Sequence, residues 1–130
     1  MGTAPDVQIR MPAESSNIGL TRLVAAALGS QAGLPIEDLD ELRMAVDELC
    51  YWLIGDGSDG TIREFLVTFA TTAGSVAAHG TTLGAGWDDL ALETDVSVLS
   101  RRILDALADD YECTCSEGVR RFSLLKLARS

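Results

Sequence analysis

One carboxylate in the sequence lies in a setting that could support acid–base chemistry. Glu48 stands between Val46 and Leu49, late in a segment with a helical apolar pattern. The sequence contains no Gly-x-Ser-x-Gly or Gly-x4-Gly-Lys-Ser motif, so it lacks the signatures of a serine hydrolase and of a P-loop phosphate site. His79 is the single histidine, and it could be a lone base or an ordinary structural residue at a strand end. Glu48 is therefore the main catalytic candidate.

Metal chemistry has little support in the sequence. The possible nitrogen and sulfur ligands are one histidine and three cysteines, without the Cys-x2-Cys or His-x3-His spacing from which a tetrahedral site is built. We therefore expect no metal site. We also expect the thiols of Cys113 and Cys115 on opposite faces of a strand, and all three thiols reduced.

Glu48 is positioned by a predicted amphipathic helix over residues 37–54. Apolar side chains recur there at steps of three and four: Leu39, Leu42, Val46, Leu49 and Leu53. Acidic side chains crowd the N-terminal end, where the helix dipole favours negative charge: Glu37, Asp38, Asp40 and Glu41. This acidic group could complement a basic protein partner. Glu48 lies near the opposite end, where the dipole disfavours an acid.

Alternation, apolar stripes and turn residues predict the element order β-α-α-β-β-α-β-β. The expected strands are 6–13, 61–70, 75–79, 111–115 and 119–128, and the expected helices are 18–29, 37–54 and 96–109. The first and last helices are expected to bury Leu20, Leu23, Val24, Ala27 and Leu28, and Leu99, Ile103, Ala106 and Leu107. Helix caps are expected within 15–17 and at Thr94 or Asp95, and a loop over 80–92. This order predicts an α+β two-layer sandwich, a largely antiparallel sheet of about five strands with three helices on one face.

Length and charge restrict the function classes. The 130 residues suit a single domain over 1–130 without a linker or repeat. The formal net charge of -10 argues against direct DNA binding, because phosphates require clustered Lys and Arg. No run approaches the ~18 apolar residues of a membrane span, and no secretory signal precedes the first strand, so we expect a cytoplasmic protein without membrane contact.

Three segments carry a resemblance to a known family. Residues 12–23 begin with Pro-Ala-Glu-Ser-Ser-Asn, residues 40–50 end with Ala-Val-Asp-Glu-Leu-Cys, and residues 103–110 read Ile-Leu-Asp-Ala-Leu-Ala-Asp-Asp. Together they resemble the histidine-kinase-type ATPase (GHKL) superfamily, and within it the RsbW- and SpoIIAB-like anti-sigma factors that act as serine kinases on anti-anti-sigma proteins. The second segment is most similar to the divergent actinobacterial (UsfX-like) branch that restrains sigma-F-class factors. The resemblance runs along nearly the whole chain and implies a degenerate Bergerat-like ATPase fold.

The resemblance gives Glu48 a role and implies an eroded nucleotide site. In active members an acid at this position activates the attacking hydroxyl or water during phosphoryl transfer. The Mg²⁺-binding Asn of active members falls at Trp52, and an indole cannot ligate Mg²⁺. The adenine-reading Asp and its glycine box fall within 77–82, and the glycine-rich lid within 96–100, and both segments depart from the family pattern. ATP and Mg²⁺ are the cofactors that the family implies, but we expect none here.

Two interpretations of Glu48 stay open at this point. It is either a working base or a solvated remnant of a kinase ancestor, beside a Trp52 that fills the former nucleotide cavity. The resemblance also places Arg22 at a first-helix arginine that in relatives contacts both the sigma factor and the anti-anti-sigma protein. An ordinary surface arginine is the alternative. Glu14 and Asn17, on the same edge, are further candidates for partner binding.

The function predicted from the sequence is that of an anti-sigma factor in a stress response. It would sequester an alternative, sigma-F/sigma-B-like sigma factor by protein–protein binding, and a STAS-type anti-anti-sigma protein would counter it. The resemblance also implies a homodimer. Two alternatives remain: an active ATP-dependent serine kinase that uses Glu48, and a degenerate domain of the superfamily that serves another partner.

Overall fold

The computed structural model describes residues 7–55, 62–84 and 96–129. Its elements in chain order are β1 (Val7–Pro12), α1 (Ser15–Gln31), α2 (Ile36–Ile54), β2 (Glu64–Thr72), β3 (Ser75–Leu83), α3 (Val98–Leu107), β4 (Asp110–Ser116) and β5 (Val119–Leu127). The predicted order of helices and strands is confirmed. None of the helices in these ranges is both long and apolar enough to cross a bilayer.

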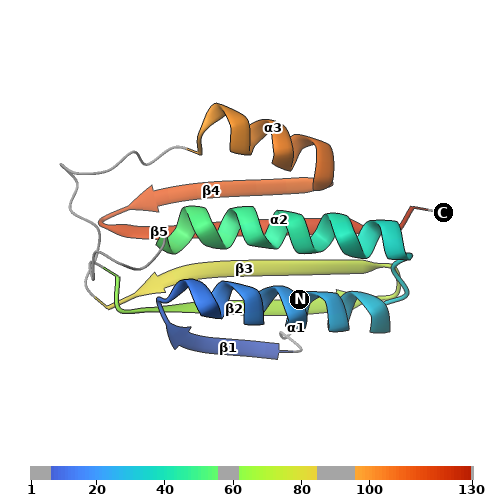
Figure 1. Ribbon diagram of the computed structural model, residues 1–130, viewed down its shortest axis with the longest axis horizontal. Coiled ribbons are helices and arrows are strands. Elements are labelled where there is room, and N and C mark those ends of the chain that lie inside the picture. The colour runs from blue at the N-terminus through green and yellow to red at the C-terminus, as the bar shows by residue number, and fades with distance from the viewer. Residues whose placement is uncertain (1–6, 56–61, 85–95, 130) are drawn as a thin grey trace.

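The strands form one sheet with the order β1-β2-β3-β5-β4, in which every neighbouring pair is antiparallel (Figure 1). β1 and β4 are therefore the two edge strands. Helices α1 and α2 lie side by side in opposite directions against one face of the sheet, and α3 packs against α2 and extends past β4 (Figure 1). The predicted α+β sandwich, with five strands and three helices, is confirmed.

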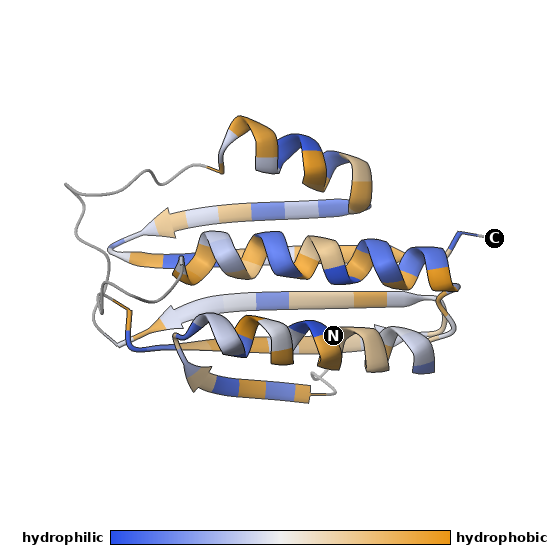
Figure 2. Cartoon of the chain, viewed as in Figure 1, coloured by the Kyte–Doolittle hydropathy of each residue, from blue (hydrophilic) through white to orange (hydrophobic). Residues whose placement is uncertain are grey.

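The core lies between the helices and the inner face of the sheet. The predicted stripe of α2 is confirmed, because four of its five residues are fully buried and Leu39 packs against them. Figure 2 shows the bands of hydrophobic and hydrophilic residues along β1 and α2 that this arrangement requires. In β2 the buried positions alternate with half-buried ones, so Phe65, Val67 and Phe69 point to the helices.

The predicted buried stripe of the first helix is correct for Leu28, which is buried, and for Val24, which packs against the core, but wrong for Leu20, Leu23 and Ala27. Helix α1 begins at Ser15, with Glu14 as its N-cap residue and no side-chain cap bond. Its buried face is rotated from the predicted one and consists of Ile18, Thr21, Ala25, Leu28 and Gly29. Leu20 is 47% exposed and Leu23 is 63% exposed. Gly29 explains the choice of face, because a Cβ there would lie 2.6 Å from Leu39 Cδ2, so only a glycine permits this approach of α1 to α2.

Two further boundaries differ from the prediction. Strand β3 continues to Leu83 through residues expected to form a loop, because β5 pairs with it as far as Thr81 and β2 as far as Leu83. Helix α3 is shorter than expected and is capped by Ser97, whose hydroxyl accepts from the Ser100 N–H at 3.1 Å. The expected caps at 94 and 95 lie outside the described residues. In α3 the fully buried residue is Leu104, whereas Leu99 is 69% exposed.

The expectation for the strand cysteines was also wrong. Cys113 and Cys115 are both half-buried on the same face of β4, because strand side chains alternate with a period of two and positions two apart share a face. Both are free thiols, as is the buried Cys50.

A buried ion cluster joins the C-terminal strand to the start of α2. Lys126, the single lysine of the chain, has a side chain only 1% exposed; it lies 3.2 Å from Glu41 and 3.9 Å from Asp38, and its ammonium donates to the Leu107 carbonyl at 2.8 Å. Arg129 donates its backbone N–H to Asp38 and pairs with Glu41, each at 2.9 Å. Two of the four acids expected to face a basic partner are therefore occupied in this cluster, and a third, Asp40, pairs with Arg43.

Candidate functional site

Glu48 lies on α2 where this helix meets the first turn of α3. The Ser100 hydroxyl donates a hydrogen bond to Glu48 Oε2 at 2.9 Å. Because Ser97 caps α3 through the Ser100 N–H, this first turn is held in place from both sides. Glu48 is half-buried, and its carboxylate meets a serine hydroxyl at a distance from which a base could accept a proton.

Trp52 lies one helical turn after Glu48 and is held by a cation from the sheet. The guanidinium carbon of Arg120, on β5, lies 5.1 Å from the centroid of the indole ring, and Arg120 Nη1 donates to the Trp52 carbonyl at 2.6 Å. The arginine therefore stacks on the ring and satisfies a carbonyl in the last turn of α2. Arg120 is 5% exposed, and this burial lowers the pKa of its guanidinium.

The groups that Trp52 and Arg120 contribute are nitrogen donors. The indole N–H of Trp52 is buried without a hydrogen-bond partner among the described residues. Mg²⁺ requires oxygen ligands, which neither side chain offers. Within the described ranges, no three His, Cys, Asp or Glu side chains are grouped so that they could hold a metal ion.

In the strand segment 77–82, where the resemblance places an adenine site, β5 covers Gly80 and holds Thr82, whereas His79, Gly80 and Thr81 line a hollow on the open face of the sheet. A Cβ on Gly80 would lie 2.2 Å from the ring of Phe122, which therefore rests directly on the glycine. The Thr82 hydroxyl accepts the Arg120 backbone N–H at 3.2 Å. Three hollows lie on the described part of the chain: one between α3 and β4, one on the open face of the sheet, and one beside Arg22. Neither Glu48 nor Trp52 lines any of these three.

The candidate partner-binding residues lie apart from Glu48 along α1. Arg22 Nη1 donates to Asp47 of α2 at 2.9 Å, and both side chains are 45% exposed. Asn17 donates its side-chain amide to the Pro12 carbonyl at 2.9 Å and so ties the start of α1 to the end of β1. Glu14 is exposed at the N-cap position. Arg22 is thus available at the surface, whereas Asn17 is held in a local structural contact.

Helices α1 and α2 carry exposed apolar side chains that the sequence prediction did not identify as a surface. Leu20 and Leu23 of α1 and Met44 and Tyr51 of α2 are between 47% and 63% exposed. A hollow of about 370 Å³ lies among Arg22, Asp40, Arg43, Met44 and Asp47. The sequence did contain an indication of this surface: apolar residues lie around most of the circumference of α1. A helix in a two-layer fold can bury only one side, so some of them must stay exposed. We call these residues, together with Arg22, the α1–α2 surface.

Comparison with known proteins gives one similar sequence and a similar fold. No protein-family model matches the chain. A segment of 51 residues is 33% identical to the serine-protein kinase RsbW of Bacillus velezensis, and it spans 38% of this chain and 32% of that relative. The crystal structure of the RsbU and RsbW domains of Rv1364c from Mycobacterium tuberculosis matches 98% of this chain and 34% of that one, with a TM-score of 0.68 and 18% identity. The chain therefore has a fold found in part of that structure, and its similarity to RsbW in sequence is limited to about a third of that relative's length.

Proposed function

We propose that this chain is an anti-sigma factor, which acts in the cytoplasm and sequesters an alternative sigma factor by protein–protein binding. A STAS-type anti-anti-sigma protein would compete for it and release the sigma factor. The α1–α2 surface is the observation that carries this proposal, and the similarity to RsbW supports the class of partner. We further propose a homodimer that forms through β1 and α1, which light scattering on the purified chain would detect.

The α1–α2 surface has the composition of a protein-binding site. It combines large apolar side chains with arginine, and such residues supply most of the binding energy at interfaces. The ion pair between Arg22 and Asp47 holds the guanidinium in place without burying it. Because an exposed pair contributes only ~0.2–1 kcal/mol, Arg22 can exchange Asp47 for an acidic group of a partner at little cost.

Binding to purified sigma-F- and sigma-B-class factors tests this function. Leu23→Asp should lower the affinity at least tenfold, because it places a charge in a desolvated contact. Arg22→Ala should also weaken binding, whereas Arg121→Ala, an exposed arginine of β5, is the matched control and should have no effect. Binding that survives Leu23→Asp and Arg22→Ala unchanged would show that this surface is not the interface.

We also propose that the nucleotide site no longer works. Trp52 and Arg120 contribute a stacked ring and a cation where the family resemblance expects a Mg²⁺ ligand, and Phe122 covers Gly80. Titration calorimetry with ATP and Mg²⁺ should therefore show no saturable binding. Micromolar affinity would contradict this proposal.

An active serine kinase is the second candidate, and one contact favours it. The hydrogen bond from Ser100 to Glu48 shows that this carboxylate accepts a serine hydroxyl at 2.9 Å. Incubation with labelled ATP and a STAS-type protein separates the candidates. Transfer of label that is lost in Glu48→Ala establishes the kinase, and the absence of transfer alongside retained sigma-factor binding establishes the anti-sigma factor alone.

A further inference from the structure

The outer edge of β4 has no neighbouring strand among the described residues. In the sheet order β1-β2-β3-β5-β4, this strand pairs only with β5. Every second residue of an edge strand directs its backbone N–H and C=O away from the sheet, so such an edge can template the addition of another strand. β4 spans seven residues, Asp110–Ser116, which is long enough for an ordinary strand pairing.

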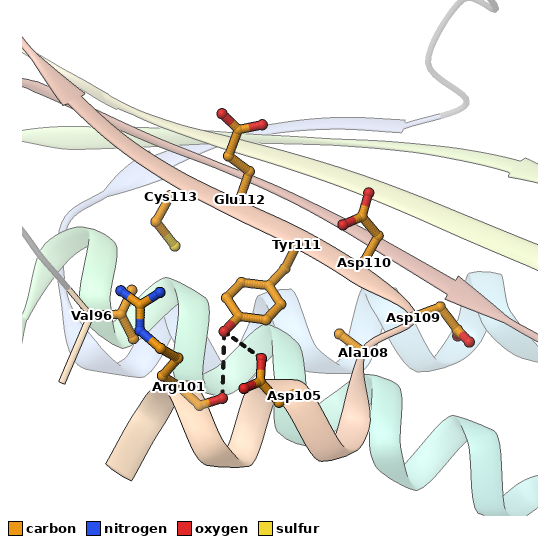
Figure 3. Close-up of a pocket in the computed structure, with 9 residues that line it drawn as sticks. All are labelled: Val96, Arg101, Asp105, Ala108, Asp109, Asp110, Tyr111, Glu112 and Cys113. Carbon is orange, nitrogen blue, oxygen red and sulfur yellow. Dashed lines mark hydrogen bonds between the residues drawn. The ribbon is translucent and has the colours of Figure 1, made fainter. Parts of the chain in front are cut away.

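A groove runs along this edge. A hollow of about 460 Å³ is lined by four consecutive β4 residues, 110–113, and by Arg101 and Asp105 of α3 (Figure 3). Consecutive strand residues point to opposite faces, so a hollow that touches all four must follow the strand edge itself. Figure 3 shows Tyr111 and Cys113 directed toward α3, and Asp110 and Glu112 directed to the other side.

The side of the groove next to α3 has a fixed geometry. The Tyr111 hydroxyl donates to Asp105 at 2.8 Å and also lies 3.4 Å from the Arg101 carbonyl oxygen. These contacts set the position of α3 relative to β4 without any backbone pairing. The space on this side is bounded by the helix, so side chains that enter it must be small enough to fit between α3 and β4.

The other side of the edge is acidic. Asp110 and Glu112 are two residues apart on the open face of β4 and exposed, and no ion pair joins either of them to another described residue. Their cross-strand neighbours on β5 are Leu125 and Ser123, which carry no charge. A second copy of β4 would bring these acids close to identical acids, which is unfavourable. The same carboxylates favour a strand with basic side chains at matching positions.

We propose that the outer edge of β4 is a second docking site, which binds an extended segment of a protein partner with Lys or Arg at every second position. The segment adds as a sixth strand. Its basic side chains lie beside Asp110 and Glu112 on the open face, and its alternate, small side chains face Tyr111 and Cys113 beneath α3. This site is separate from the α1–α2 surface, and the inference does not depend on the sigma-factor proposal.

A blocked heptapeptide that alternates Lys and Val is a suitable probe. Added to the ¹⁵N-labelled full chain at low salt, it should shift the backbone amide signals of residues 110–116. The central strand β2 is the internal control, because β1 and β3 pair with it on its two sides and leave no edge for an added strand. Two N-methylated peptides, one methylated at the lysines and the other at the valines, then test strand pairing. Only one of them should lose binding, because an added strand directs alternate N–H groups to the edge.

The charges are tested by a double variant at two exposed positions. Asp110→Lys with Glu112→Lys should weaken the Lys-Val peptide about tenfold, as expected from the loss of two exposed charge pairs, and should create binding of a Glu-Val peptide. Equal binding of both N-methylated peptides would refute strand addition. Shifts confined to residues outside 110–116, or the absence of shifts at millimolar peptide, would refute the site.

Discussion

Replacement of Lys126 by methionine should strongly destabilise the fold. The substitution keeps most of the length of the side chain but removes a cation that is 1% exposed and lies within 4.0 Å of Asp38, Glu41 and Asp109. The side chain of Asp38 is 2% exposed, so its charge would remain buried with only Arg129 beside it. Breaking a buried pair by removal of one partner costs about 3–5 kcal/mol, a large part of the ~5–15 kcal/mol that stabilises a domain.

Urea unfolding, followed by circular dichroism, measures this cost. In thermal unfolding of a chain of this size, the same loss of free energy corresponds to a decrease in Tm of roughly 10–20 °C. Arg121→Met is the matched control, because it removes an equal charge from an exposed position of the same strand and should change the free energy of unfolding by no more than about 0.5 kcal/mol. Glu41→Gln in the Lys126→Met background should recover part of the loss, since it removes one of the three acidic charges left around the missing ammonium. A Lys126→Met protein within ~0.5 kcal/mol of the parent would show that the cluster does not hold the C-terminal strand to α2.

Three other measurements test the packing and the thiols. Gly80→Ala should cost about 1–3 kcal/mol of stability, because the new methyl group would lie 2.2 Å from the Phe122 ring, and Phe122→Leu in the same chain should relieve part of this cost. Ser100→Ala should cost about 1 kcal/mol in urea unfolding, and this cost should vanish in a Glu48→Ala background, which has no side-chain acceptor, if the hydroxyl acts through that carboxylate. Burial raises the pKa of Cys113 from 9.0 to about 11, so the folded protein holds that proton more tightly and stability should fall as the pH rises from about 9 to 11. Urea midpoints that stay constant over this range, or a fall that Cys113→Ala leaves unchanged, would contradict this assignment.

The amino-acid sequence by itself determined the order of helices and strands, and it determined which side chains of most strands point to the core. Alternation along β2 and the regular stripe of α2 each allow one buried face, because a strand repeats every two residues and an amphipathic helix every 3.6. The resemblance of three segments was sufficient to anticipate the fold. The sequence also identified Glu48 and Trp52 as the pair of interest, because the two residues are one helical turn apart and differ in what they can bind.

Only the tertiary structure decided which face of α1 is buried and what Glu48, Trp52 and β4 contact. Helix α1 has apolar side chains around most of its circumference, and Gly29, through its close approach to Leu39, leaves Leu20 and Leu23 at the surface. The partners of Glu48 and Trp52 are Ser100 and Arg120, which are 52 and 68 residues away in sequence. Such contacts, like the position of β4 at the edge of the sheet, follow from strand order, and local patterns carry no information about strand order.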